Sequence, residues 1–120
     1  MQSSQQQLMP VIDGALLGVR VNSAINMYRN EQLMNLSPVE VIYKLYAVAI
    51  QAMKKRDNQL AQRAINELIV GLNFEHREVA LPLYRLYQYS KYCLRQGRIN
   101  DAVQVIEELR SAWGEAFKLQ

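Results

Sequence analysis

His76 is the one histidine of the chain, so it is the first candidate for acid–base catalysis or metal binding. It lies in a turn rich in Glu and Arg, with no second histidine and no nucleophilic side chain near it in the sequence. A helical bundle that binds metal supplies a Glu-x-x-His pair from each of two helices, and this sequence has no such pair. Glycine motifs that bind phosphates or dinucleotides are also missing. We therefore expect His76 to lie at the surface or cap a helix, and we expect no catalytic, cofactor-binding or metal-binding residues and no enzyme activity.

Cys93 is the second candidate for chemistry, and it falls on the apolar face of a predicted helix. A lone cysteine in that position is expected to be a small buried apolar residue, and it excludes an internal disulfide framework. Residues 1–19 contain no Lys or Arg, so they do not resemble a signal peptide. The apolar run 8–19 is too short to cross a bilayer. We expect a cytoplasmic protein without membrane insertion.

Tyrosines and basic residues could mediate binding rather than catalysis. Tyr46 and Tyr87 occupy inward-facing helical positions and are expected in the core with their hydroxyls at its edge, whereas Tyr43 falls off these positions and suits a protein-binding face. The cluster 54–56 is basic but lies at a helix end, where it complements the helix dipole. With a net charge of +3 and no continuous basic face, the chain is not expected to bind nucleic acid. The other tyrosines are Tyr28, Tyr84, Tyr89 and Tyr92.

The most informative element is a helix predicted from Ser37 to about Lys55. Ser37 is a suitable N-cap, Pro38 suits the first helical position, and Glu40 completes a capping box. The body of this helix is apolar around most of its circumference, with few strongly polar residues after Glu40. Such a helix is either central in the fold or lacks a partner that would cover it. In a chain of 120 residues, we take this apolar excess as an indication of a binding surface.

Helical periodicity predicts the remaining elements. Asp57 or Asn58 is expected to cap a helix that Gly71 and Asn73 end. Pro82 leaves two alternatives for the following helix, which begins near Ala80 or begins near Glu75 with a kink. The other expected elements are a Ser/Gln-rich tail over 1–7, a short helix or extended arm over 8–19, a short helix over 21–33, an end at Gly97 for the helix that contains Pro82, and a last helix over 99–118 with Glu107, Glu108, Arg110 and Glu115 facing water.

A similar apolar pattern begins at Ala61 and recurs 41 residues later at Ala102. Tetratricopeptide repeats recur at about 34 residues and need roughly three units. The spacing instead favours two helical hairpins, and hence an all-α fold: an antiparallel four-helix bundle with an extra short N-terminal helix or arm. We expect residues 1–20 to form the arm and residues 21–120 to form the bundle domain.

Four blocks of the sequence follow one another between about residue 22 and residue 118. They are Tyr28-Arg29, Ser37-Pro38-x-Glu40-x-Ile42-x-x-Leu45-Tyr46 with Ala49-Ile50, Leu83-x-x-Leu86-Tyr87-x-Tyr89, and Glu108-Leu109-Arg110-x-Ala112-Trp113-x-Glu115-Ala116. In their order and spacing these blocks resemble the flagellin export chaperone family (FliS). Two departures are a short connection before the fourth helix, with Pro82 where many members have a longer acidic turn, and an N-terminal extension that is longer than usual.

The resemblance implies a cytoplasmic chaperone that binds the disordered C-terminal segment of flagellin, prevents premature polymerisation and delivers it to the flagellar type III export apparatus. Binding would be helix-in-groove, without a cofactor, by a monomer or weak homodimer. For each implied contact the alternative is a bundle-core residue, and for Leu45 and Ala49 that alternative is at least as good. The implied client-binding residues are Tyr28, Ile42, Tyr43, Leu45, Tyr46, Ala49, Ile50 and Met53.

A different class of protein also fits the sequence, namely a structural adaptor whose apolar surface is covered by self-association. Sizing chromatography separates the two, because the adaptor would form a salt-stable dimer that does not bind flagellin. The apolar arm within residues 1–20 could also fold back over the groove as a lid. Deletion of residues 1–20 would then tighten the binding of a flagellin C-terminal peptide.

Overall fold

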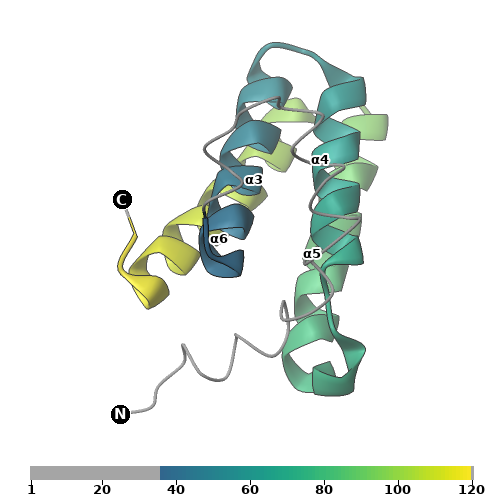
Figure 1. The fold of residues 1–120 in the computed structure, drawn as a ribbon. Helices are drawn as coiled ribbons and strands as arrows, with labels where there is room; N and C mark the ends of the chain where they lie inside the picture. The colour runs from purple at the N-terminus through teal and green to yellow at the C-terminus, as the bar shows by residue number, and fades with distance from the viewer. Residues whose placement is uncertain (1–35, 120) are drawn as a thin grey trace.

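The computed structural model of the protein describes residues 36–119, and within this range the regular structure is helical (Figure 1). The elements are α3 (Pro38–Lys54), α4 (Asn58–Val70), the short 3-10 helix η2 (Phe74–His76), α5 (Arg77–Arg95) and α6 (Ile99–Phe117). The four α-helices confirm the predicted all-α bundle. The expected arm over 1–20, the short helix over 21–33 and Tyr28 lie outside the described residues.

The start of α3 has the cap that the sequence predicts. The Ser37 hydroxyl accepts a hydrogen bond from the Glu40 backbone N–H at 3.2 Å, and the Glu40 carboxylate accepts one from the Ser37 N–H at 2.9 Å. Pro38 occupies the first turn, where no donor is lost. The capping box therefore fixes the beginning of α3, and the last basic residue, Lys54, complements its C-terminal end.

The other boundaries follow the predicted signals, with one adjustment at Pro82. Asp57 caps α4 by accepting from the Leu60 N–H at 3.1 Å, and Gly71 ends it. Helix α5 begins at Arg77, between the two predicted alternatives, and carries Pro82 inside it. Pro82 is exposed and lies in the second turn, so its missing N–H affects a single bond near the helix start, at a surface where water can hydrate the freed carbonyl.

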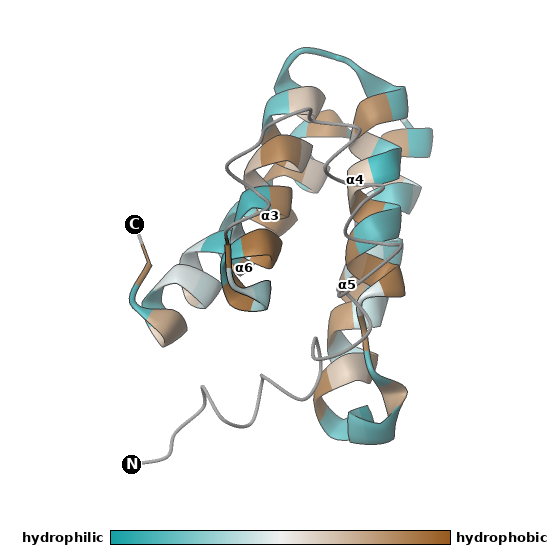
Figure 2. Cartoon of the chain, viewed as in Figure 1, coloured by the Kyte–Doolittle hydropathy of each residue, from teal (hydrophilic) through white to brown (hydrophobic). Residues whose placement is uncertain are grey.

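The helices are arranged in a ring in which α3 and α5 lie diagonally opposite each other. Helix α3 packs against α4 and α6, and α5 packs against the same two helices (Figure 1). Hydrophobic and hydrophilic turns alternate along the helices, and the α3–α4 loop is hydrophilic (Figure 2). Most of the apolar residues of α3 are buried by the other helices of this ring. The buried residues of α3 are Val39, Val41, Ile42, Leu45, Tyr46, Val48, Ala49, Ala52 and Met53.

Candidate functional site

The expected binding residues divide into a buried group and a partly exposed group. Tyr43 and Ile50 are half-buried and remain accessible from the surface of α3. Tyr28 lies outside the described residues. The other five have their side chains in the core of the bundle, which corresponds to the alternative weighed for Leu45 and Ala49. These five, with their exposed fractions, are Ile42 (2%), Leu45 (3%), Tyr46 (0%), Ala49 (0%) and Met53 (0%).

Tyr46, Tyr87 and Trp113 form an aromatic centre that joins α3, α5 and α6. The hydroxyls of Tyr46 and Tyr87 are 2.7 Å apart and hydrogen-bonded inside the core, not at its edge as the sequence suggested. The Tyr46 ring meets Trp113 edge to face, with centroids 6.0 Å apart. The Trp113 indole N–H donates to the Val39 carbonyl at 3.0 Å. Every polar atom of these three side chains therefore has a partner, as burial requires.

Burial changes the titration of both tyrosines in this centre. Desolvation raises the pKa of Tyr46 well above its ordinary value, and the neighbouring Tyr87 raises it further. Desolvation also raises the pKa of Tyr87, while its hydrogen bond with Tyr46 partly offsets this rise. The cause is the cost of placing a phenolate in an apolar interior. Both phenols stay protonated at neutral pH and serve structure.

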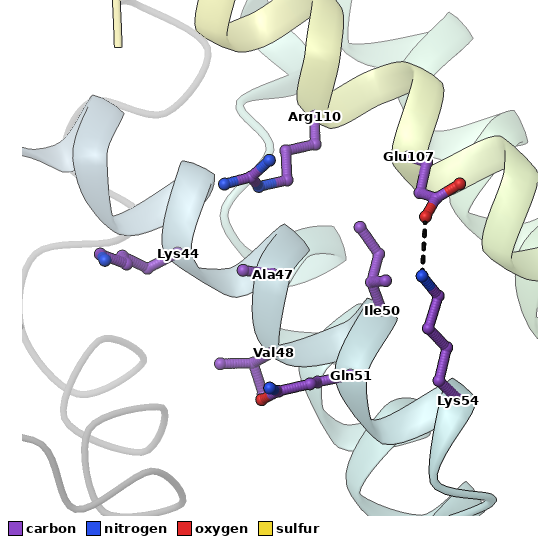
Figure 3. Close-up of a pocket in the computed structure, with 8 residues that line it drawn as sticks. All are labelled: Lys44, Ala47, Val48, Ile50, Gln51, Lys54, Glu107 and Arg110. Carbon is purple, nitrogen blue, oxygen red and sulfur yellow. Dashed lines mark ion pairs between the residues drawn. The ribbon is translucent and has the colours of Figure 1, made fainter. Parts of the chain in front are cut away.

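An open trough lies between α3 and α6, on the other side of α3 from this closed packing. Its volume is about 540 Å³. Ile50 points from α3 toward α6, and Lys54 reaches across to Glu107 on α6 in an ion pair of 3.1 Å (Figure 3). We call this feature the α3–α6 trough. Its lining residues are Lys44, Ala47, Val48, Ile50, Gln51, Lys54, Glu107 and Arg110.

Tyr43 lies beside the trough, where Arg110, one of the lining residues, contacts its ring. The Arg110 guanidinium lies over the Tyr43 ring, 4.4 Å from its centroid, in a cation–π contact. Gly114 makes room for this ring, because a Cβ atom at position 114 would lie 2.9 Å from Tyr43 Cε1. A second depression of about 360 Å³ adjoins the far side of Arg110 and includes Tyr43 and Gly114 in its lining. The Tyr43 ring is thus held between Arg110 and Gly114 of α6 and remains partly exposed.

Sequence reasoning missed Glu107 and Arg110 as site residues, since it assigned both to the water-facing side of the last helix. They are at the surface, but they also line the trough (Figure 3). One signal could have pointed to them: Gly114 is an isolated glycine inside a helical pattern, which often marks a close approach by another group. That group is Tyr43, and Arg110 is one helical turn before Gly114 on the same face.

The described part of the chain offers binding surfaces rather than reactive groups. Cys93 is buried, as predicted. His76 is half-buried at the start of α5 and makes no side-chain capping bond. Among residues 36–119, no three His, Cys, Asp or Glu side chains gather in a way that could hold a metal ion. Across these same residues, every helix is too short or too polar to cross a membrane.

Comparison with known proteins places the chain in a family. No curated protein and no solved structure was found to match it. The family described as Flagellar protein FliS matches residues 21–120, which include every residue of the bundle and of the trough. This match covers most of the chain. The chain therefore belongs to the FliS family and has the role of a flagellar export chaperone.

Proposed function

We propose that this protein binds the C-terminal segment of flagellin in the cytoplasm, keeps it from polymerising and delivers it to the flagellar type III export apparatus. The α3–α6 trough is the observation that supports this assignment most directly. It combines an apolar floor at Ala47, Val48 and Ile50 with charged side chains at its edges. An amphipathic helix fits a groove of this composition, with its apolar face on the floor.

The accessible members of the expected set make the direct contacts in this proposal. Tyr43 and Ile50 present partly exposed apolar surface beside the trough. The five buried residues shape α3 from inside, and Tyr28 stays a predicted contact. Ordering a disordered segment costs about 1–2 kcal/mol of backbone entropy per residue. Burial of apolar surface, at roughly 25 cal/mol per Å², must offset that cost. The client must therefore lie along an extended surface, of which the trough is the described part.

Ile50→Ser tests the trough as the binding surface. A labelled peptide of the flagellin C-terminal segment is titrated into the full chain by fluorescence anisotropy. We expect the affinity to fall about three- to tenfold, because full burial of an isoleucine contributes about 1.5–3 kcal/mol and Ile50 is already half-buried in the free protein. The melting temperature should change little, since Ile50 is half-buried in the free protein.

Leu86→Ser is the matched control, because Leu86 is an exposed aliphatic residue on α5, away from the trough. Its affinity for the peptide should equal that of the unaltered chain. Equal losses from Ile50→Ser and Leu86→Ser would refute the trough as the binding surface. Failure of the unaltered chain to bind any part of the flagellin C-terminal segment would refute the proposed client.

One observation favours the structural adaptor as a second candidate function. Leu86, Tyr89 and Tyr92 are all about two-fifths exposed on α5 and give that helix an apolar outer face. Self-association through this face would bury it. Sizing chromatography of the full chain decides between the functions. A dimer that persists in high salt and does not bind flagellin supports the adaptor, whereas a one-to-one complex with the flagellin peptide supports the chaperone.

A further inference from the structure

The charges around the α3–α6 trough are unbalanced toward positive. Among the residues that the structure describes, Lys44, Lys54 and Arg110 line it, and Glu107 is the one acidic residue in its lining. Lys54 and Glu107 neutralise each other in an ion pair of 3.1 Å. The positive charges of Lys44 and Arg110 therefore stay uncompensated within the trough. Lys44 extends away from the centre, while the Arg110 guanidinium reaches from α6 toward α3 (Figure 3).

Within residues 36–119, no carboxylate forms an ion pair with Arg110. Its guanidinium stacks on Tyr43 at 4.4 Å, and Gly114 allows Tyr43 to lie there. The Nε atom is buried and has no hydrogen-bond partner in the structure. A guanidinium presents its N–H groups in a planar fork that matches the two oxygens of a carboxylate. The stacking contact leaves the edge of this fork available for such an acceptor.

We propose that Arg110 determines client specificity by binding the carboxylate of an Asp or Glu side chain on the helix that occupies the trough. This inference rests on the proposed function. Residues 44–54 of α3 border the trough and span about 15 Å, which corresponds to about ten helical residues. A client helix that lies along these residues passes Arg110 on α6 and presents a side chain to it. The preferred client segment is amphipathic, with an acidic residue next to its apolar face.

The test combines Arg110→Gln with charge removal in the client. Each acidic residue of the flagellin C-terminal peptide is replaced singly by its amide, and anisotropy measures the affinity of every peptide for both proteins. We expect Arg110→Gln to weaken the unaltered peptide by about ten- to a hundredfold, as for a hydrogen bond to a charged group. One of the peptides with an amide substitution should bind the unaltered protein with a loss of affinity equal to the loss that Arg110→Gln causes. That peptide should bind Arg110→Gln with no further loss.

Four controls keep the experiment specific. Arg95→Gln removes an equal charge from an exposed position on α5 and should leave the affinity within twofold. Arg110→Lys keeps the charge but loses the planar fork, so its affinity for the peptide should lie between the affinities of the unaltered protein and of Arg110→Gln. Thermal melting of each variant shows that the bundle remains folded. A peptide with a carboxamide C-terminus should bind as tightly as the free acid.

The outcomes separate this inference from the function on which it rests. If the unaltered chain does not bind the flagellin peptide, both fail together. If it binds, but Arg110→Gln weakens binding no more than Arg95→Gln does, the function stands and the role of Arg110 is wrong. The same conclusion follows if no single acidic position is coupled to Arg110. Loss of binding on amidation of the chain end would assign the carboxylate to the terminus and overturn the side-chain assignment.

Discussion

The aromatic centre and the α3–α6 trough both involve α3 and α6, yet the aromatic centre is closed and the trough is open. In the aromatic centre, α6 presents Trp113, which packs on Tyr46 and bonds to the Val39 carbonyl. In the trough, α6 presents Glu107 and Arg110, whose charged ends keep contact with solvent. The composition of α6 thus decides whether the apolar surface of α3 is sealed or left accessible. Helices α3 and α6 therefore form closed core packing on one side of α3 and an accessible surface on the other side.

The largest effect on stability is expected from Trp113→Ala, which disrupts the closed packing of the aromatic centre. The change removes the bond to Val39 and the ring contacts to Tyr46 and to Phe117, whose centroid is 4.9 Å away. The free energy of unfolding should fall by about 3–5 kcal/mol, as for other buried large-to-small changes. Urea unfolding followed by circular dichroism measures it. Tyr92→Ala, at an exposed position on α5, serves as control and should cost less than about 1 kcal/mol.

A second effect should appear at alkaline pH, again on the closed side. The pKa values of Tyr46 and Tyr87 are raised above 10.0 in the folded chain. As the pH rises, both hydroxyls therefore stay protonated in the folded chain at pH values where they are already deprotonated in the unfolded chain. Stability from this source is therefore full below about pH 9 and falls above pH 10. At pH 11 the loss should reach about 3 kcal/mol for the pair. Urea unfolding at pH 9 and 11 measures it.

The matched variant for this pH dependence is the double change Tyr46→Phe and Tyr87→Phe. It removes both hydroxyls together and should be nearly neutral at pH 7, because neither partner is left alone. Between pH 9 and pH 11 it should lose about 3 kcal/mol less than the unaltered chain. An equal loss in both proteins would mean that other groups cause the alkaline unfolding.

The smallest change in stability is expected from Gly114→Ala, which probes the open side. The added Cβ would lie 2.9 Å from Tyr43 Cε1 and must displace the ring from beneath Arg110. The helix propensity of alanine, worth about 1 kcal/mol over glycine, offsets the strain. The free energy of unfolding should therefore stay within about 1 kcal/mol of its original value, while affinity for the flagellin peptide falls several-fold.

Gly97→Ala provides the opposite pattern as a control for this last prediction. Gly97 has a φ of +75° and nothing within 4 Å of an added Cβ, so alanine there strains the backbone without touching the trough. Stability should decrease by about 1 kcal/mol with unchanged peptide affinity. If both variants alter affinity equally, Tyr43 is not the link between Gly114 and binding.

Local signals in the sequence were sufficient to predict the four α-helices within residues 36–119. Ser37, Asp57 and Gly71 mark three helix boundaries because capping depends on residues close together in the chain. The burial of α3 could not be predicted in the same way. Its apolar pattern shows that partners exist, but not which side each neighbouring helix covers. Likewise, the meeting of Tyr46 with Tyr87 depends on how the two hairpins align, and that alignment is a property of the assembled bundle.

The candidate site was less predictable than the fold for a related reason. Ile50 was identified through the family resemblance, and Tyr43 because it falls outside the inward-facing stripes. Arg110 looked like an ordinary surface residue, since a cation on the polar side of a helix has the same pattern whether or not a cavity lies beside it. The contact with Tyr43 at 4.4 Å distinguishes it, and that contact joins residues far apart in the chain.

The hydrogen bond between Tyr46 and Tyr87 has a consequence for how this sequence can evolve. The two positions are 41 residues apart, the same separation as the matching patterns of the two hairpins, so the bond joins equivalent points of the two halves of the bundle. Replacing one tyrosine by phenylalanine strands a buried hydroxyl, whereas replacing both leaves an apolar pair. A sequence with a substitution at only one of the two positions is therefore less stable than a sequence with both tyrosines or with neither. Substitutions at the two positions should consequently occur together during evolution.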